Sequence, residues 1–420
     1  MPPSQGRRLV IVGASLAGLR AVEAARAAGH PGPVTLIGAE EHLPYDRPPL
    51  SKAYLDAGPV PPVRFREREY LRDELGVELM LGEPASGLDP DAREVLVGDR
   101  RIGYDGLVIA TGARARTLPG TEHLVGVHTV RTLDDAVAVR AALDAGARTV
   151  VVGAGFIGSE VASGARKRGL PVTLVEAQAT PLVRAIGGEM GTALSALHTA
   201  HGTDLRCGVG VETVEGTDRV TGVRLADGTV LAADLVVAGI GATPQTEWLE
   251  GSGLTLDDGI VVDETLATDL PGVYAAGDVA RWRNPLFADL PTGGPMRIEH
   301  WTNAAEQGAV AARNAVAPEA RTAYETVPYF WSDWYESRIQ FVGIPAADEI
   351  RVVSGSVRER RFVALYRTGD RLTAALTLDR RADVMKYRVQ IGRRSSWEAA
   401  LELAEKRNAA AAATQAAGGA

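Results

Sequence analysis

Two glycine-rich turns in the chain have the residue types and spacing to bind phosphate groups. The first is Gly13-Ala-Ser-Leu-Ala-Gly18 and the second is Gly153-Ala-Gly155-Phe-Ile-Gly158. A helix that begins at such a turn presents unpaired backbone N–H groups and the positive end of its dipole, which together bind a pyrophosphate. Ser15 replaces the middle glycine of the usual fingerprint, and its small size keeps the prediction of a dinucleotide site.

An acidic residue follows the next apolar run after each turn. Glu40 comes after Val34–Ile37 and Glu176 comes directly after Val172–Val175. A carboxylate in this position accepts hydrogen bonds from the ribose of a dinucleotide. Because Glu176 would repel a 2′-phosphate and no arginine follows before Arg184, we predict NADH rather than NADPH at the second turn.

Two dinucleotide sites in one chain favour hydride transfer from a visiting nicotinamide to a bound flavin. The alternative is that one of the two turns is degenerate and is kept only for packing.

The elements that must position these turns form a repeated unit of strand, helix and strand. The pattern predicts a strand at Leu9–Val12 with a helix at Ala17–Ala28, and again a strand at Thr149–Val152 with a helix at Ile157–Arg168. Two later strands end in glycine turns, which add Thr111, Gly112 and Gly241 to the candidate cofactor-binding residues. We therefore predict an α/β protein with two Rossmann-like, three-layer dinucleotide-binding domains and a C-terminal α+β domain with an antiparallel sheet.

The expected domain boundaries follow from this repeat and from a change of composition near Tyr324. Residues 1–113 and 245–320 are predicted to form an FAD-binding domain, 114–244 an NAD-binding domain and 321–407 the C-terminal domain. Ser395 and Glu398 have the spacing of a capping box that opens a last helix. Residues 408–420, which are almost all Ala and Gly, are expected to be a disordered tail.

Composition excludes several classes of protein. The 420 residues are 45% hydrophobic and 23% charged and carry a net charge of −8, which argues against wholesale disorder and against a dedicated nucleic-acid binder. No apolar run reaches the roughly 20 residues of a membrane span, so we expect a cytoplasmic protein that has no membrane contact. The single cysteine, Cys207, excludes an intrachain disulfide and a Cys-x-x-Cys site, and we predict no metal site.

Four further motifs are Pro44-Tyr-Asp-Arg-Pro-Pro-Leu-Ser-Lys52, Ala110-Thr-Gly112, Tyr274-Ala-Ala-Gly-Asp278 and Arg297-Ile-Glu-His-Trp-Thr-Asn-Ala-Ala-Glu-Gln-Gly308. Together they resemble the FAD-dependent NADH:ferredoxin reductases, the putidaredoxin reductase-like enzymes of bacterial cytochrome P-450 and aromatic dioxygenase systems. The similarity runs from about Leu9 to Arg394.

The resemblance implies a glutathione-reductase-like fold in which the first turn and Glu40 hold the ADP half of FAD. It implies that Arg47 and Lys52 line the flavin and that Asp278 binds its ribityl chain. Pro48 with its neighbouring proline would stiffen the segment between them. A helix entered near Trp301 would point its N-terminus at the flavin and stabilise the charge of the reduced ring.

The same resemblance pairs Lys52 with Glu160 as an ion pair beside the flavin and makes them the candidate catalytic residues. Spacing alone leaves a solvated loop lysine and a first-turn helix acid as alternatives. Trp301 and Trp331 are either core residues or flavin neighbours. Relatives commonly carry Gln in place of Trp334. Its segment is expected to be a loop in the domain that faces the flavin and the partner, so acceptor choice is the open point.

With no cysteine pair available, Cys207 is interpreted as a structural thiol and electrons must leave the flavin directly. We predict hydride transfer from NADH to FAD and then single-electron transfer to a transiently bound [2Fe–2S] ferredoxin, by a monomer or weak homodimer. Alternatives are a rubredoxin reductase, an NADH oxidase or a redox-sensing interaction flavoprotein. Candidates for a basic docking patch are Arg313, Arg338, Lys386 and Arg388.

Overall fold

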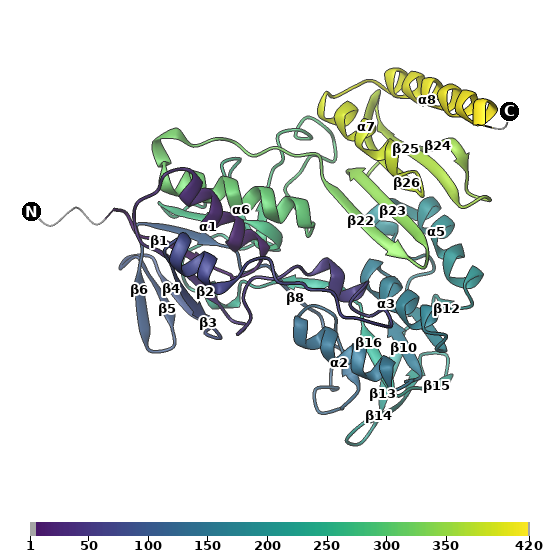
Figure 1. Ribbon diagram of the computed structural model, residues 1–420, viewed down its shortest axis with the longest axis horizontal. Coiled ribbons are helices and arrows are strands. Elements are labelled where there is room, and N and C mark those ends of the chain that lie inside the picture. The colour runs from purple at the N-terminus through teal and green to yellow at the C-terminus, as the bar shows by residue number, and fades with distance from the viewer. Residues whose placement is uncertain (1–5, 419–420) are drawn as a thin grey trace, which may run out of the picture. The chain divides into compact units, whose positions relative to one another are not determined.

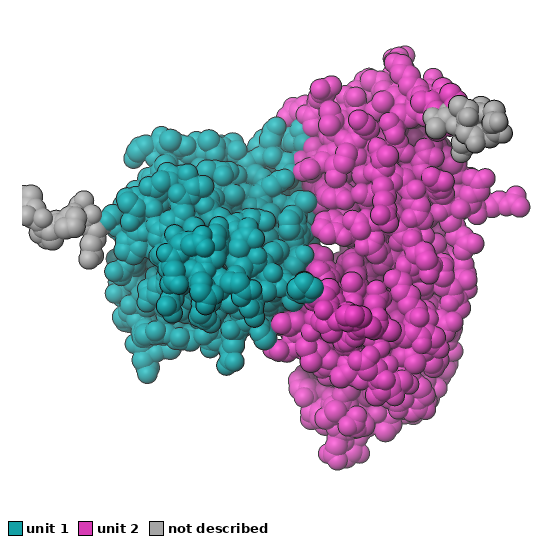
Figure 2. Space-filling model, in the orientation of Figure 1, with its two compact units in different colours: residues 1–47, 62–114, 242–326 teal, residues 48–61, 115–241, 327–420 magenta. Residues whose placement is uncertain are grey.

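A computed structural model describes residues 6–418, and the chain divides into two compact units (Figure 2). Unit 1 comprises residues 1–47, 62–114 and 242–326, and unit 2 comprises residues 48–61, 115–241 and 327–420. Unit 2 therefore contains most of the predicted NAD-binding domain and most of the predicted C-terminal domain, together with a short segment that includes Lys52. Which ligand each part binds remains a prediction.

Unit 1 is built on a five-stranded parallel sheet in the order β19-β7-β1-β2-β3. The central strand β1 is buried at every position, as are its neighbours β2 and β7, because the sheet is covered on both faces. The bounds of these elements and of the smaller sheets are β1 Leu9–Val12, β2 Val34–Gly38, β3 Val77–Leu81, β4 Ala85–Asp89, β5 Glu94–Val97, β6 Arg100–Gly103, β7 Gly106–Ile109, β8 Ala113–Ala115, β17 Ala242–Pro244, β18 Ile260–Val262, β19 Val273–Ala275, β20 Ala280–Trp282 and β21 Met296–Arg297.

Unit 2 contains a second parallel sheet of five strands in the order β12-β11-β10-β16-β9. Helices α2 and α3 pack against it, and α5 contacts its edge strand β12. The bounds are β9 Val127–His128, α2 Leu133–Asp144, β10 Thr149–Val152, α3 Phe156–Lys167, β11 Val172–Glu176, α4 Val183–Ile186, α5 Gly188–Ala200, β12 Asp204–Cys207, β13 Val211–Gly216, β14 Val220–Leu225, β15 Val230–Ala232 and β16 Leu235–Ala238.

The C-terminal part of unit 2 is an antiparallel sheet in the order β22-β23-β26-β25-β24, with α7 packed on β23 and β26 (Figure 1). Its inner strands β25 and β26 are buried along almost their whole length. The bounds are β22 Tyr329–Trp334, β23 Ser337–Gly343, β24 Glu349–Ser356, β25 Arg361–Thr368, β26 Arg371–Leu378, α7 Arg381–Gly392 and α8 Trp397–Gly418.

These sheets confirm the predicted fold class, but three local predictions differ from the structure. The hydroxyl of Ser396, not of Ser395, caps the last helix by accepting a hydrogen bond from the N–H of Ala399 at 3.2 Å. Helix α8 continues to Gly418 where disorder was expected from residue 408, in keeping with the high helix propensity of alanine. Residues 419–420 of the predicted tail lie outside the described residues. The segment that ends at Trp334 is strand β22 rather than a loop.

No helix within residues 6–418 combines the length and the apolar composition that crossing a bilayer requires.

The two long helices of unit 1, α1 (Leu16–Ala27) and α6 (Trp301–Val316), lie side by side and approach closely (Figure 1). A Cβ atom added at Gly308 would lie 2.2 Å from the carbonyl oxygen of Ala17. Only glycine therefore permits this helix contact, which holds α1 and its glycine turn against α6.

Replacing Gly308 by alanine should lower the free energy of unfolding by about 2 kcal/mol, because the helices must move apart. The loss would appear although alanine raises helix propensity by about 1 kcal/mol. Urea denaturation followed by circular dichroism measures the change. Gly294→Ala is the control, since Gly294 is exposed and a Cβ there meets no atom within 4 Å. Equal stability of the two variants would contradict the prediction.

Candidate functional site

The first and last glycines of both turns are required by the packing of the protein itself. Gly13 and Gly153 have φ of +121° and +97°, and a Cβ at these positions would lie 2.1 Å from the Ala110 oxygen and 2.4 Å from the Gly239 oxygen, respectively. At Gly18 and Gly158 a Cβ would collide with the carbonyl oxygen of the first glycine of the same turn. These four glycines allow each helix to pack closely against its sheet.

The middle position of each turn is different. Gly155 has an extended backbone with φ of −72°, and an added Cβ would meet only the Gly239 oxygen at 3.8 Å. The protein therefore leaves room for a side chain where the sequence has none, which fits close approach by a ligand. Ser15 holds the equivalent position in the first turn, also in extended conformation.

Both helices begin in a way that suits an anion. Neither Ser15 nor Gly155 provides a side-chain cap, and neither α1 nor α3 has an acidic residue in its first turn. The first N–H groups of each helix are therefore available to phosphate oxygens, and the helix dipole adds to the attraction. The residues at both turns fit a dinucleotide.

The register of the strands shows that the two predicted acids are not equivalent. Val12 pairs with Ile37 in unit 1, and Val152 pairs with Val175 in unit 2. The residue after Val175 is Glu176, whereas the residue after Ile37 is Gly38, so Glu40 lies two positions beyond the equivalent of Glu176. Sequence spacing alone had suggested the same role for both.

Glu176 is hydrogen-bonded to its own glycine turn. Its Oε2 accepts from the N–H of Ala154 at 2.9 Å, and its Oε1 accepts from the N–H of Gln178 at 2.9 Å. The carboxylate is thereby fixed at the end of β11 and keeps further acceptor capacity for ribose hydroxyls.

Cys207 lies opposite Glu176 on β12 and is exposed, so it is not the core residue that a structural thiol would be. Partial burial and the nearby Glu176 carboxylate raise the pKa of the Cys207 thiol. The thiol therefore stays protonated, which makes it a poor nucleophile.

Glu40 is instead part of a polar cluster with Arg47 and Tyr45. Its Oε1 accepts from Nη2 of Arg47 at 2.6 Å, and its Oε2 accepts from the Tyr45 hydroxyl at 2.5 Å. Arg47 also donates to the Tyr45 hydroxyl at 2.9 Å and from Nε to the Ser15 hydroxyl at 3.3 Å. The cluster thus brings the guanidinium to the first glycine turn.

The groups around Arg47 stabilise the charged form of its guanidinium. Burial lowers the pKa of the Arg47 guanidinium, but Tyr45, Glu40 and Asp278 together raise it above its ordinary value. The structure therefore gathers four predicted site residues of unit 1 around the start of α1: Ser15, Glu40, Arg47 and Asp278. A permanently positive group beside a helix N-terminus suits a pyrophosphate.

The remaining predicted residues at the turns have local partners. The Thr111 hydroxyl donates to the Gln245 carbonyl at 3.0 Å, and Gly112 follows with φ of +68°. Trp301 is the first residue of α6, and its indole N–H donates to Asp46 at 2.8 Å. Gly241 has φ of +101°, which favours glycine at that turn.

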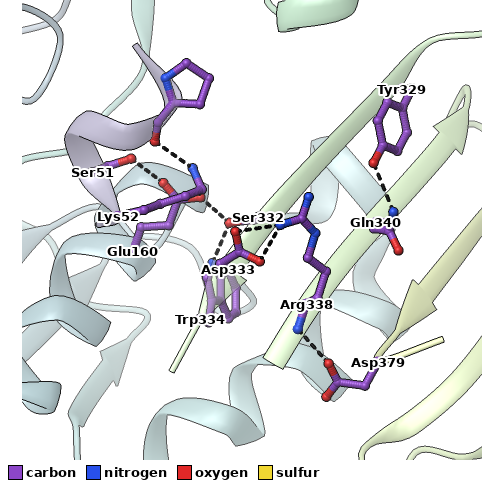
Figure 3. A network of polar contacts seen from close by, with 11 residues as sticks. Ser51, Lys52, Glu160, Tyr329, Ser332, Asp333, Trp334, Arg338, Gln340 and Asp379 are labelled. Atoms are coloured by element: carbon purple, nitrogen blue, oxygen red, sulfur yellow. Dashed lines mark hydrogen bonds and ion pairs between the residues drawn. The ribbon is translucent and has the colours of Figure 1, made fainter. Parts of the chain in front are cut away.

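Lys52 and Glu160 form an ion pair in unit 2, with Nζ 2.9 Å from Oε1 (Figure 3). The Glu160 side chain is 2% exposed and the Lys52 side chain 15%, which rules out a solvated lysine and a surface helix acid. Nζ of Lys52 also donates to the Pro48 carbonyl at 3.3 Å. The pair is therefore held in a largely dry environment, and its place beside a flavin stays a prediction.

Two serines also contact the Glu160 carboxylate, and neither was predicted from the sequence. The hydroxyls of Ser51 and Ser332 each donate a hydrogen bond to the carboxylate (Figure 3). Ser51 could have been suspected from its position next to Lys52. Ser332 gave no such signal, because it lies 172 positions from Glu160 in the chain.

Trp334 was expected in a loop, and this expectation is wrong because it is the last residue of strand β22. Its side chain is 1% exposed and its indole N–H donates to the Ser332 hydroxyl at 2.8 Å. Trp331 is half-buried, stacks on Tyr329 and lies under the guanidinium of Arg338. Trp334 is therefore an interior residue, hydrogen-bonded to a serine that contacts Glu160, and not a surface residue.

The four basic candidates for a docking patch differ in their surroundings. Arg338 is bound by both oxygens of Asp333, at 3.1 and 3.0 Å, which offsets its charge. Arg388 is half-buried and donates to the Val327 carbonyl. Arg313 and Lys386 are exposed.

The chain matches two models of known protein families. The family model for pyridine nucleotide-disulphide oxidoreductases matches residues 7–308, and the model for the reductase C-terminal domain matches residues 329–410. The chain belongs to the pyridine nucleotide-disulphide oxidoreductase family.

Two curated relatives of this oxidoreductase cover nearly all of its length. Rhodocoxin reductase of Rhodococcus erythropolis is 40% identical over 384 residues, which is 90% of this chain and 88% of the relative. Putidaredoxin reductase CamA of Pseudomonas putida is 37% identical over 385 residues, which is 89% of this chain and 88% of the relative.

A solved structure of the same family has the same fold. It is the covalent putidaredoxin reductase–putidaredoxin complex, with a TM-score of 0.88 and 34% identity over 96% of this chain and 99% of the other. The oxidoreductase fold supports the assignment of FAD and NADH as its cofactors. The two glycine turns supply the residues that fit them.

A buried histidine, His198, is hydrogen-bonded to the residue next to Glu160 in this oxidoreductase. The ring of His198 on α5 is hydrogen-bonded to the Tyr335 hydroxyl at 2.8 Å and to the hydroxyl of Ser159, the neighbour of Glu160, at 3.1 Å. Burial, together with nearby His201, lowers the pKa of His198 to about 4. His198 is therefore neutral at pH 7.

This histidine should make stability depend on pH. The unfolded chain, with an ordinary histidine pKa of about 6.5, binds more protons than the folded chain down to pH 4, so acidification destabilises the fold across that window. We expect His198 to contribute a loss of about 2 kcal/mol between pH 7 and pH 5. Urea midpoints at the two pH values measure it.

The variant His198→Gln should show a smaller difference between the two pH values. His123→Gln, at an exposed position, is the control and should keep the full difference. If both variants respond to pH like the unchanged chain, His198 does not carry this dependence.

Proposed function

We propose that the chain is the NADH-dependent reductase of an oxygenase system and passes electrons to a [2Fe–2S] ferredoxin. The observation that carries this proposal is the absence of a second cysteine in a pyridine nucleotide-disulphide oxidoreductase fold. A disulfide reductase of this fold needs a cysteine pair, and Cys207 is single, exposed and protonated. Electrons that reach the flavin must therefore leave without a thiol relay.

The names of relatives support a ferredoxin as the acceptor. A 5,5′-dehydrodivanillate O-demethylase ferredoxin reductase subunit is 38% identical to this chain, and the ferredoxin–NAD(+) reductase subunit of a benzene 1,2-dioxygenase system is 37% identical. Each covers at least 80% of this chain.

Each unit contributes a binding function to the proposed reaction. In unit 1 the start of α1, Ser15 and Arg47 would hold the pyrophosphate of FAD, and Asp278 would bind the ribityl chain. In unit 2 the start of α3 would hold the pyrophosphate of NADH, and Glu176 would accept hydrogen bonds from its ribose. When both are bound, NADH supplies a hydride to FAD, which supplies electrons one at a time.

The Lys52–Glu160 pair would orient the reactants of this step. Ser51, Ser332 and Lys52 all donate to one buried carboxylate, so the ammonium group has a fixed position. Such pre-organisation avoids reorganising the site during the reaction.

Anaerobic titration of the FAD-loaded protein with NADH tests the proposal, followed by addition of an oxidised [2Fe–2S] ferredoxin. We expect the flavin absorbance to bleach with NADH and to return as the ferredoxin is reduced. A parallel comparison of turnover with rubredoxin and with air-saturated buffer distinguishes the rubredoxin reductase and the NADH oxidase. Bleaching without rapid transfer to any acceptor would favour a redox-sensing protein, and no bleaching would remove the proposal.

Replacing Gly155 by alanine should separate binding from folding. Because the backbone is extended and the protein leaves space for a Cβ, the free energy of unfolding should change by less than about 0.5 kcal/mol. A pyrophosphate in contact with the turn would meet the added methyl group, so the Kd for NADH should rise about tenfold. Equilibrium titration with NADH measures the second effect.

Gly188→Ala is the matched control, since Gly188 is likewise a glycine at the start of a helix of unit 2 and a Cβ there meets no atom within 4 Å. It should change neither quantity. If Gly155→Ala binds NADH as the unchanged chain does, the nucleotide does not rest on this turn.

A further inference from the structure

Trp334 is hydrogen-bonded to Ser332, which in turn donates to Glu160, although Trp334 does not touch the carboxylate itself. It is the last residue of β22, and its indole N–H donates to the Ser332 hydroxyl at 2.8 Å (Figure 3). An indole N–H can donate but cannot accept a hydrogen bond. The direction of this bond is therefore fixed.

The fixed direction determines where the proton of Ser332 points. A serine hydroxyl has one proton, and it otherwise rotates to suit its surroundings. Because the Ser332 oxygen already accepts from Trp334, its proton is directed to Oε1 of Glu160. Ser332 is fully buried, so water does not compete for either bond.

The Glu160 oxygen that accepts from Ser332 also forms the ion pair with Lys52. Oε1 of Glu160 is bonded to the Ser332 hydroxyl and lies 2.9 Å from Nζ of Lys52. A change in the hydroxyl direction therefore shifts the oxygen that fixes the ammonium group. The other oxygen, Oε2, accepts from the Ser51 hydroxyl.

Aromatic packing fixes the indole of Trp334 in turn. Its ring centroid lies 6.0 Å from that of Phe156 and 4.8 Å from that of His198. Phe156 is the first residue of α3, the helix that also carries Glu160. Trp334 thus packs directly on α3 through Phe156 and is linked to Glu160 of the same helix through the Ser332 hydroxyl.

We propose that Trp334 is a positioning residue for the Lys52–Glu160 pair and acts through the hydroxyl of Ser332. The inference rests on the proposed function, in which this pair orients hydride transfer. It assigns Trp334 to the step from NADH to flavin and not to the choice of acceptor protein. Glutamine, whose side-chain amide has two N–H donors, could also donate to Ser332.

Two substitutions at this position distinguish donation from packing. Trp334→Phe keeps an aromatic ring and removes the donor, so the rate of flavin reduction by NADH should fall about fivefold in anaerobic stopped-flow measurements. Trp334→Gln restores a donor and loses the ring, so its rate should lie closer to that of the unchanged chain. If Trp334 only fills space, the order reverses, because glutamine leaves the larger gap, and the proposal is overturned.

Substitutions along the hydrogen bonds test the path. Adding Trp334→Phe to Ser332→Ala should cause no further loss of rate, because the hydroxyl through which Trp334 acts is already absent. Full additivity of the two losses would exclude Ser332 as the intermediary. Tyr329→Phe is the control, since it removes a hydrogen bond with Gln340 from the same two strands without touching Glu160.

A spectroscopic measurement on the oxidised FAD-loaded protein is independent of activity. With ¹⁵N-labelled tryptophan, the indole N–H signal of Trp334 is identified by its loss in Trp334→Phe. It should shift in Ser332→Ala and in Glu160→Gln but not in Tyr329→Phe. An unshifted signal in Glu160→Gln would show that Trp334 and Glu160 are not coupled.

Failure of this inference is distinguishable from failure of the proposed function. If the unchanged chain is not reduced by NADH, the function is wrong whatever the variants do. If it is reduced and Trp334→Phe reacts at the same rate, only the role of Trp334 is wrong.

Discussion

The arrangement of unit 2 depends on keeping one carboxylate charged inside the protein. Glu160 lies on α3 at 2% exposure, where an unpaired charge would be costly. Three donors from two places in the chain offset this cost: Ser51 and Lys52 from the segment after Pro48, and Ser332 from strand β22. Burial of this charge therefore requires that the segment after Pro48 and strand β22, which are distant in sequence, both contact Glu160.

Much of the fold and the positions of the glycine turns could be predicted, because they depend on local patterns. The glycine at the start of each turn, the β-branched runs before it and the helix after it are adjacent in sequence. Period and spacing are enough to locate such a unit. The fold class, the turns and the approximate bounds of α1 and α3 were predicted for this reason.

What sequence reasoning missed depends on contacts between distant segments. The role of Ser332 follows from the packing of β22 on α3, and nothing near Ser332 in the chain indicates it. The unequal positions of Glu40 and Glu176 follow from strand register, which a count of residues between motif and acid does not reveal. Trp334 was misplaced because its segment was taken for a loop, whereas it ends a strand and is buried.

The exposed position of the sole cysteine has a practical consequence. Because Cys207 is the only thiol and lies at the end of β12 across from Glu176, a maleimide dye or spin label would attach at one known point. No native cysteine would have to be removed first. The raised pKa of the thiol means that such labelling proceeds better in mildly alkaline buffer than at neutral pH.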